Sequence, residues 1–401
     1  MKTLYLHIGM PKTGTSSIQK FLLKNRSALR QHGYCFPKLP YQYPFTFQNR
    51  NGYFLIGKQY NEDGSRNQAL EKEYLKEGMA KICNYFETYD HIILSEETLW
   101  RAFRTHSYLF PYLKKHAKNH GYQIRIIVYL RRQDEYQLSL WKQNVKHPKT
   151  AQTLPFELRL KQVLTEEPLT LQYASTLDEI ADIFGKDSLI VRRFERSSWK
   201  NGSIIDDFLD CIGLEHTEEY KELPREINPS LSENMAQIKR FINKDQTFST
   251  EENAYLVQFL RALSPESSAL YPCSMLSVDE TRALLDQFAE ENQRVAKDYI
   301  GDGKPLFSNE IKELPKWDAD NPYLTEDLVR FFSAVCVDLH RENESLHAQL
   351  SETQTELAQL KKELTTLDTT VKQEQSLLRS FRYKLKHPFR TLWNRMFHRS
   401  N

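Results

Sequence analysis

The N-terminal half of the chain alternates short apolar runs with longer stretches in which apolar residues recur at helical spacing. The first run sets Leu4, Leu6 and Ile8 against more polar neighbours, and this period of two predicts a strand over residues 3–8. Further apolar runs predict strands at 90–95, 124–130 and 188–193. The stretches between them predict helices at 16–30, 67–88, 104–119, 133–147 and 203–212. Strands that alternate with helices are typical of βα units, so we expect an α/β fold with a mainly parallel sheet flanked by helices.

The region that follows favours helix over strand, as the spacing of Met235 and Ile238 illustrates. We expect this helical subregion, about 229–303, to pack on the sheet within one domain that covers residues 1–324. Its last segment, 304–324, predicts a connecting loop because it contains several prolines and few helix signals.

Residues 325–378 are predicted to form a helix and a coiled coil. Apolar residues alternate three and four positions apart over about four heptads. The seam consists of Leu346, Leu350, Leu357, Leu360, Leu364, Leu367, Val371 and Leu378. A coiled coil over 339–378 that joins two copies into a homodimer explains this seam, and Asn343 at an a-type position favours a parallel pair. The alternative is a single amphipathic helix that docks on its own domain.

The last residues, 379–401, form a basic tail in which aromatic residues alternate with basic ones. Residues 376–401 contain seven of the 55 basic residues and no acidic residue, so the rest of the chain is mildly acidic. Such a tail is typical of an amphipathic segment that lies on an anionic membrane surface, although Pro388 is expected to kink it. Nucleic-acid binding is the alternative for a basic stretch, and we do not expect it here.

The composition indicates a globular protein of the reducing cytosol. Hydrophobic residues make up 40% of the chain and aromatic residues 12%, which argues against extensive disorder. The five cysteines contain no C-x-x-C pair and suggest neither a disulfide framework nor a zinc site. No apolar run is long enough to span a bilayer, and the first residues predict a strand rather than a signal peptide. We therefore expect a cytoplasmic protein that is peripheral on the inner face of the membrane.

The strongest candidate for chemistry is the segment Gly9–Ser17, between the first predicted strand and the first predicted helix. Glycines allow backbone N–H groups to converge, and a helix N-terminus adds a favourable field for a phosphate. The residues expected to contact this anion are Pro11, Lys12, Thr13, Gly14, Thr15, Ser16 and Ser17.

The glycine spacing of this loop also occurs in nucleoside triphosphatases. Their loop carries a lysine directly after the second glycine, where this chain has Thr15, and its lysine is Lys12 instead. The loop is therefore P-loop-like, but it lacks the lysine that contacts the β- and γ-phosphates in nucleoside triphosphatases. A nucleotide kinase or hydrolase stays open as the enzymatic alternative.

A second anion site is indicated where the predicted strand 124–130 ends. Arg131 follows that strand, and Ser139 lies eight positions later in the next predicted helix. A guanidinium offers paired donors in a fixed fork, which suits phosphate, and a serine hydroxyl completes the contacts.

These two elements together resemble the sulfotransferases that use 3′-phosphoadenosine 5′-phosphosulfate (PAPS), in particular bacterial carbohydrate-type members. The segment His7–Gln19 is similar to their 5′-phosphosulfate-binding loop, and Arg131 with Ser139 is similar to their 3′-phosphate site. The resemblance implies that Lys12 is catalytic, stabilising the transferring sulfuryl group and the leaving oxygen. It also implies PAPS as co-substrate, adenosine 3′,5′-bisphosphate as product, and no metal.

The base that removes the acceptor's proton has two candidates just past the predicted strand 90–95. Some members of the family use a glutamate at a similar strand end, so the resemblance implies Glu96, with Glu97 in reserve. The alternative is that these carboxylates cap the helix that begins near Thr98. His91 lies at the wrong end of the strand to serve.

The acceptor is expected to be a hydroxyl of a glycan or glycolipid, since surface polysaccharide is a common substrate of the bacterial proteins that the chain resembles. Aromatic and polar residues crowd the segment 41–54, where rings can stack on sugars or form a satellite core. A non-catalytic membrane-associated scaffold is the alternative outside the enzymes.

Overall fold

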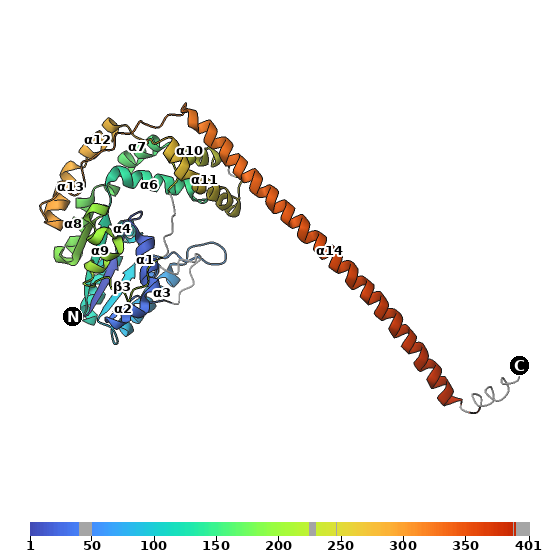
Figure 1. Cartoon of the computed structure of the whole chain (residues 1–401). Helices are drawn as coiled ribbons and strands as arrows, with labels where there is room; N and C mark the ends of the chain where they lie inside the picture. The colour runs from blue at the N-terminus through green and yellow to red at the C-terminus, as the bar shows by residue number, and fades with distance from the viewer. Residues whose placement is uncertain (40–49, 224–229, 246, 388, 390–401) are drawn as a thin grey trace. The chain divides into compact units, whose positions relative to one another are not determined.

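A computed structural model describes residues 1–39, 50–223, 230–245, 247–387 and 389 (Figure 1). The chain divides into two compact units, Met1–Leu328 and Val329–Asn401. The finer division expected from the sequence stays a prediction.

The first unit is built on a five-stranded sheet in the order β2-β3-β1-β4-β5, with every pair of neighbours parallel. The strands are β1 (Thr3–His7), β2 (Tyr34–Cys35), β3 (His91–Ser95), β4 (Gln123–Leu130) and β5 (Leu189–Arg193). The predicted α/β class with a parallel sheet is thereby confirmed. Strand β2 was not predicted, because two residues are too short to show a period.

Nine helices connect or follow the strands in the described part of residues 1–223. They are α1 (Thr15–Lys24), α2 (Arg26–Gln31), α3 (Gln68–Tyr85), α4 (Leu99–Thr105), α5 (Leu109–His120), α6 (Gln133–Lys146), α7 (Phe156–Glu166), α8 (Tyr173–Phe184) and α9 (Ile204–Cys211). Short 3₁₀ turns lie at Tyr53–Leu55, Pro168–Thr170, Lys186–Ser188, Arg196–Ser198 and Lys200–Gly202. The single helix predicted over 16–30 is two helices, because the Asn25 amide bonds to the carbonyl groups of Phe21 and Lys221 at the break.

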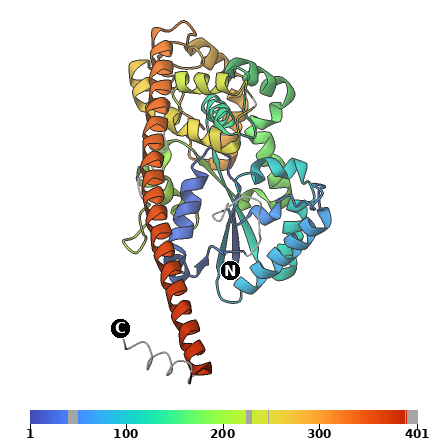
Figure 2. The ribbon, with the colours of Figure 1, turned by 90° about the vertical axis from the view of Figure 1, so that its right-hand side faces the viewer.

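Helices cover both faces of the sheet. On one face, α1, α2 and α9 pack over the strands in a cluster that includes Phe21, Ile127 and Phe208, all essentially inaccessible. On the other face, α5 packs on β4 with α3 beside it (Figure 2). A parallel sheet buried on both faces exposes only its strand ends, so a ligand meets it at the carboxyl edge.

The described residues between 230 and 300 are helical apart from the connections. The helices are α10 (Glu233–Ile242), α11 (Thr250–Leu270), α12 (Val278–Asp286) and α13 (Ala289–Val295), followed by a π-helical turn (Ala296–Ile300). Helices α10, α11 and α12 each begin at a serine whose side chain accepts from a backbone N–H of the first turn. Helix α10 packs on α6, which ties this subregion to the sheet domain.

The predicted loop 304–324 contains no strand or helix until α14 begins at Pro322. Helix α14 (Pro322–Lys386) has 65 residues, and most of it belongs to the second unit. The apolar seam predicted for a coiled coil is exposed along it, with Leu357 51% and Leu364 69% accessible. The dimeric coiled coil stays a prediction. The tail lies outside the described residues from 390 onward. No described helix combines the length and the hydropathy that a membrane crossing requires.

Candidate functional site

The segment between β1 and α1 is a tight loop at the carboxyl edge of the sheet. Its first residues continue β1 against β4, since the Met10 N–H donates to the Tyr129 carbonyl (3.2 Å) and the Tyr129 N–H to the Gly9 carbonyl (2.9 Å). Gly9 has a φ of 100°, and a Cβ there would lie 2.7 Å from the carbonyl oxygen of Glu97. Glycine is therefore required for the loop to approach the end of β3 this closely.

Helix α1 starts from this loop with an open N-terminus. Gly14 at the N-cap has a φ of 73°, no side chain caps the first turn, and no acidic residue lies in it. Ser16 and Ser17 are exposed in that turn. The first N–H groups and the helix dipole are thus available to an anion, as the sequence predicts.

The remaining hydroxyls of the loop are bonded within the protein. Thr13 is buried and donates to the Met10 carbonyl (2.6 Å), which fixes the curvature of the loop. Thr15 donates to the Glu97 carboxylate. Pro11 is half-buried beside them. Thr13 therefore shapes the loop and Thr15 positions a carboxylate, and both hydroxyl protons are used in these bonds.

Lys12 lies at the top of the loop with a φ of 67° and is half-buried. Its Nζ lies 3.4 Å from the Oε1 of Gln143 on α6, so the loop and α6 face each other. Burial lowers the pKa of Lys12, nearby Glu97 opposes this shift, and Arg131 and Arg261 add to it.

The side chain of Lys12 belongs to a group of four cations that we call the cationic cluster: Lys12, Arg131, Lys146 and Arg261. Burial, and after it the charges of Lys12, Arg261 and Lys142, lower the pKa of Lys146 to about 8. Neither Lys146 nor Arg261 has a hydrogen bond or ion pair to any residue that the structure describes. Like charges held together with one nearby carboxylate favour binding of an anion.

The two residues predicted to bind a second phosphate lie next to this loop. The Nη1 of Arg131 donates to the Lys12 carbonyl (3.2 Å), and its guanidinium lies 5.4 Å from the centre of the Phe194 ring. Ser139 is half-buried on α6, one turn before Gln143, and therefore on the face that meets Lys12. Lys12 therefore contacts Arg131 directly, and Ser139 lies one helical turn from Gln143, the residue of α6 that Lys12 contacts.

The two adjacent glutamates predicted as base candidates have different surroundings. The Glu96 side chain is fully buried, and Arg50 donates to both of its oxygens, with the Nε–Oε2 distance at 2.9 Å. Thr98 adds its N–H (3.0 Å) and its hydroxyl (2.6 Å). This carboxylate is enclosed and already accepts four hydrogen bonds, so its geometry disfavours the role of base, which nevertheless stays untested.

Glu97 instead turns toward the loop. Its side chain is 25% exposed and accepts a hydrogen bond from the Thr15 hydroxyl. Its negative charge opposes the lowering of the Lys12 pKa. Its other nearby cation, Arg50, is 3.9 Å away. Glu97 is thus the accessible carboxylate of the site.

The aromatic-rich segment 41–54 is described only from residue 50 onward. Asn51 is buried and bonds to the backbone of β3, donating to Ile93 (2.9 Å) and accepting from the Ser95 N–H (2.8 Å). Phe54 is also buried. This part of the segment is therefore satellite core, and its polar groups hold the end of β3.

Sequence reasoning did not find Gln143, Lys146 and Arg261. Gln143 and Lys146 recur with Ser139 at helical spacing on α6, a signal that appears once the face of α6 is known. Arg261 comes from α11, and nothing in its neighbourhood along the sequence marks it.

The fold and the site together define an α/β protein with a glycine-containing anion loop and a half-buried cationic cluster at the carboxyl edge of a parallel sheet. No protein-family model matches the chain. It is 29% identical over 177 residues to an uncharacterized protein of Archaeoglobus fulgidus, an alignment that covers 44% of this chain. The chain spans about half of that relative, 46% of its length.

Among solved structures, the sulfotransferase from Alicyclobacillus acidocaldarius is similar at a TM-score of 0.32 and 15% identity. The similarity covers 61% of this chain and 94% of that one.

Replacing Glu96 should lower the unfolding free energy more than replacing Glu97. Glu96→Gln removes a fully buried carboxylate that accepts from Arg50 and Thr98, and is expected to cost about 3–5 kcal/mol of unfolding free energy. Glu97→Gln keeps a partner for Thr15 in a partly exposed position and should cost about 1 kcal/mol or less. Urea unfolding measures both, and equal losses would contradict the structural role of Glu96.

Binding of sulfate to the cationic cluster should depend on pH through Lys146. Sulfate keeps its charge over the range, whereas Lys146, with a pKa of about 8, loses its proton. Affinity should be flat below that pKa and fall about tenfold one pH unit above it. Calorimetry checks this, with Lys146→Met as control: it should bind more weakly and without the fall. If Lys146→Met shows the same loss of sulfate affinity at high pH, another titrating group causes that loss.

Proposed function

We propose that this protein transfers a sulfuryl group from PAPS to a hydroxyl acceptor. The observation that carries the proposal is the cationic cluster beside an uncapped helix N-terminus and a glycine loop. PAPS is a polyanion with charge at two separated positions, its 5′-phosphosulfate and its 3′-phosphate. The cluster offers cations from a loop, a strand end and two helices, which suits such a ligand.

In this proposal the 5′-phosphosulfate lies on the loop. The backbone N–H groups of the loop and of the start of α1, together with the exposed hydroxyls of Ser16 and Ser17, hold its oxygens, and Lys12 neutralises charge on the bridging oxygen. Arg131 and Ser139 hold the 3′-phosphate. Lys146 and Arg261 were not part of the sequence expectation, and we assign them to the same donor.

The transfer step needs a base and no metal. The acceptor oxygen forms a bond to sulfur while the bond from sulfur to the bridging oxygen breaks, and the electron pair of that bond stays on the phosphate. The acceptor's proton passes to a carboxylate, for which we propose Glu97 because it is accessible and faces the loop. Adenosine 3′,5′-bisphosphate leaves as product, with Lys12 stabilising its charge.

A glycan or glycolipid is proposed as acceptor. This choice rests on the family resemblance of the sequence, and the described residues of the segment 41–54 add no sugar contact to it.

Turnover with labelled PAPS and a panel of cell-envelope glycans tests the proposal. Lys12→Ala should lower kcat/KM by about 10²–10³, the effect of removing one donor to a developing negative charge. Glu97→Gln should lower kcat by about 10²–10⁴ with little change in donor binding. Lys115→Ala, an exposed lysine on α5, is the matched control and should act like the unaltered protein.

Two outcomes of that assay would replace the proposal. Mg²⁺-dependent turnover of ATP would identify a nucleotide kinase or hydrolase. Tight binding of PAPS without transfer to any glycan would identify a non-catalytic scaffold.

We further propose that the exposed seam of α14 over 339–378 pairs with a second copy of the chain, and that 379–401 contact an anionic membrane. The leucines of the seam are more than half exposed on a helix of 65 residues, and burying them against a second copy removes them from water.

Three chain lengths separate these two properties. Sedimentation equilibrium should show dimers for the full chain and for 1–378, and monomers for 1–338. Flotation with vesicles of anionic phospholipid should carry only the full chain. A dimer of 1–338 would contradict the coiled coil, and flotation of 1–378 equal to that of the full chain would contradict the membrane contact.

A further inference from the structure

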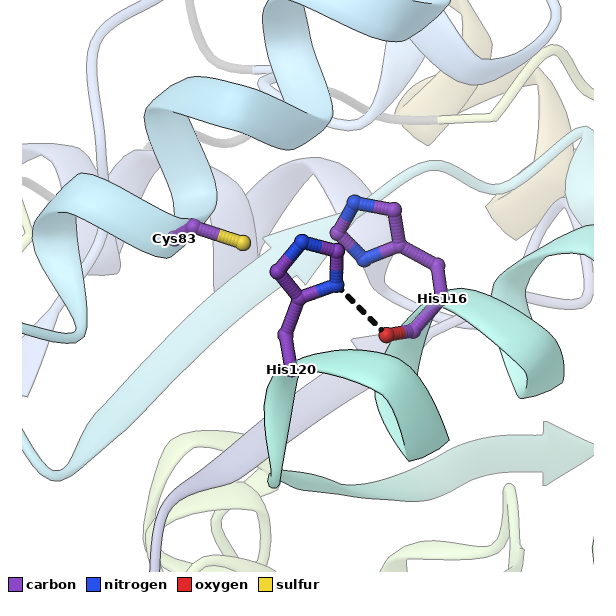
Figure 3. Close-up of side chains that lie close together, drawn as sticks. All are labelled: Cys83, His116 and His120. Carbon is purple, nitrogen blue, oxygen red and sulfur yellow. Dashed lines mark hydrogen bonds between the residues drawn. The ribbon is translucent and has the colours of Figure 1, made fainter.

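Three potential metal ligands lie together far from the loop: Cys83 on α3, and His116 and His120 on α5 (Figure 3). One ligand atom of each lies within 4.8 Å of those of the other two. Helices α3 and α5 end here just before β3 and β4 begin, so the group lies at the amino edge of the sheet. The proposed donor site lies at the opposite, carboxyl edge.

The two histidines present their rings side by side. They are one helical turn apart, and the ring centres are 4.1 Å apart with an angle of 17° between the planes. Figure 3 shows Cys83 directed from the facing helix toward the His120 ring. Ligands from two helices therefore converge on one point.

Hydrogen bonds at the Nδ1 atoms leave the Nε2 atoms for a ligand. The Nδ1 of His120 lies 2.9 Å from the His116 carbonyl oxygen, which can only accept, so this nitrogen carries the proton. The neutral ring then has its lone pair on Nε2. The Nδ1 of His116 lies 2.9 Å from the Tyr122 hydroxyl. Outer hydrogen bonds of this kind, to a carbonyl or another oxygen, orient histidines that bind metals.

We propose that Cys83, His116 and His120 form a binding site for a zinc-like divalent transition metal, with a water as fourth ligand. A thiolate and two imidazoles are the donors that zinc prefers, whereas magnesium and calcium prefer oxygen. Zinc–ligand bonds of about 2.0–2.3 Å require the three atoms to move together by about 1 Å. His120 is exposed and the other two are half-buried, so the metal has a path in from solvent.

The site links α3, which precedes Glu96 and Glu97 in the sequence, to α5, which follows them. A metal that binds the folded chain in preference to the unfolded chain stabilises it. The expected effect of the metal is therefore on the stability of the fold, and the proposal does not depend on the proposed sulfuryl transfer.

Titration of the metal-free full chain with Co²⁺ tests the site, because a cobalt–thiolate bond gives a charge-transfer absorption in the near ultraviolet. One Co²⁺ per chain should bind, and Zn²⁺ should displace it. Cys83→Ser should lose the charge-transfer band. His120→Ala should weaken Co²⁺ binding more than about 100-fold, and Tyr122→Phe about 10-fold, as expected for a group that orients a ligand.

Cys336→Ser, which removes an exposed cysteine of α14, is the matched control and should keep the band. Zn²⁺ should raise the thermal midpoint of the full chain and leave that of Cys83→Ser unchanged, with circular dichroism verifying that each variant folds. No charge-transfer band in the unaltered chain, or an equal band in Cys83→Ser, would overturn the proposal.

Discussion

The concentration of positive charge around Lys12 is the constraint on which the site depends. Besides burial, the charges of Arg131 and Arg261 help to lower the pKa of Lys12, those of Lys12 and Arg261 help to lower the pKa of Lys146, and Glu97 opposes the shift at Lys12. Holding such charges together costs free energy that an anion recovers when it binds. This concentration of positive charge is the reason why we propose a polyanionic ligand for the site rather than an uncharged one.

The two adjacent glutamates at the end of β3 have different surroundings. Strand β3 ends at Ser95, and the chain turns so that Glu96 points into the protein toward Arg50 while Glu97 points toward the loop. The buried pair holds the segment from residue 50 against β3, and Asn51 bonds to the backbone beside it. These bonds fix the chain at the end of β3, so the neighbouring residue Glu97 is held in a defined position beside the loop of Lys12.

The two edges of the sheet carry different chemistry. The cationic cluster lies at the carboxyl edge, where a glycine loop and a helix N-terminus offer N–H donors. Soft nitrogen and sulfur ligands lie at the amino edge, between α3 and α5. Because the sheet separates them, a metal at one edge would act on the other only through the elements that join them.

The sequence by itself determined the elements whose signals are local: four of the five strands, the loop with its glycines, and the helix that follows it. Periodicity and glycine spacing depend on neighbours along the chain, so they can be read without a fold. Only the tertiary structure decided that Glu96 is enclosed and Glu97 accessible, that Lys146 and Arg261 join Lys12, and that Cys83 meets two histidines of another helix. These contacts depend on how helices pack on the sheet. Burial and distance between residues remote in sequence exist only after that packing has brought them together.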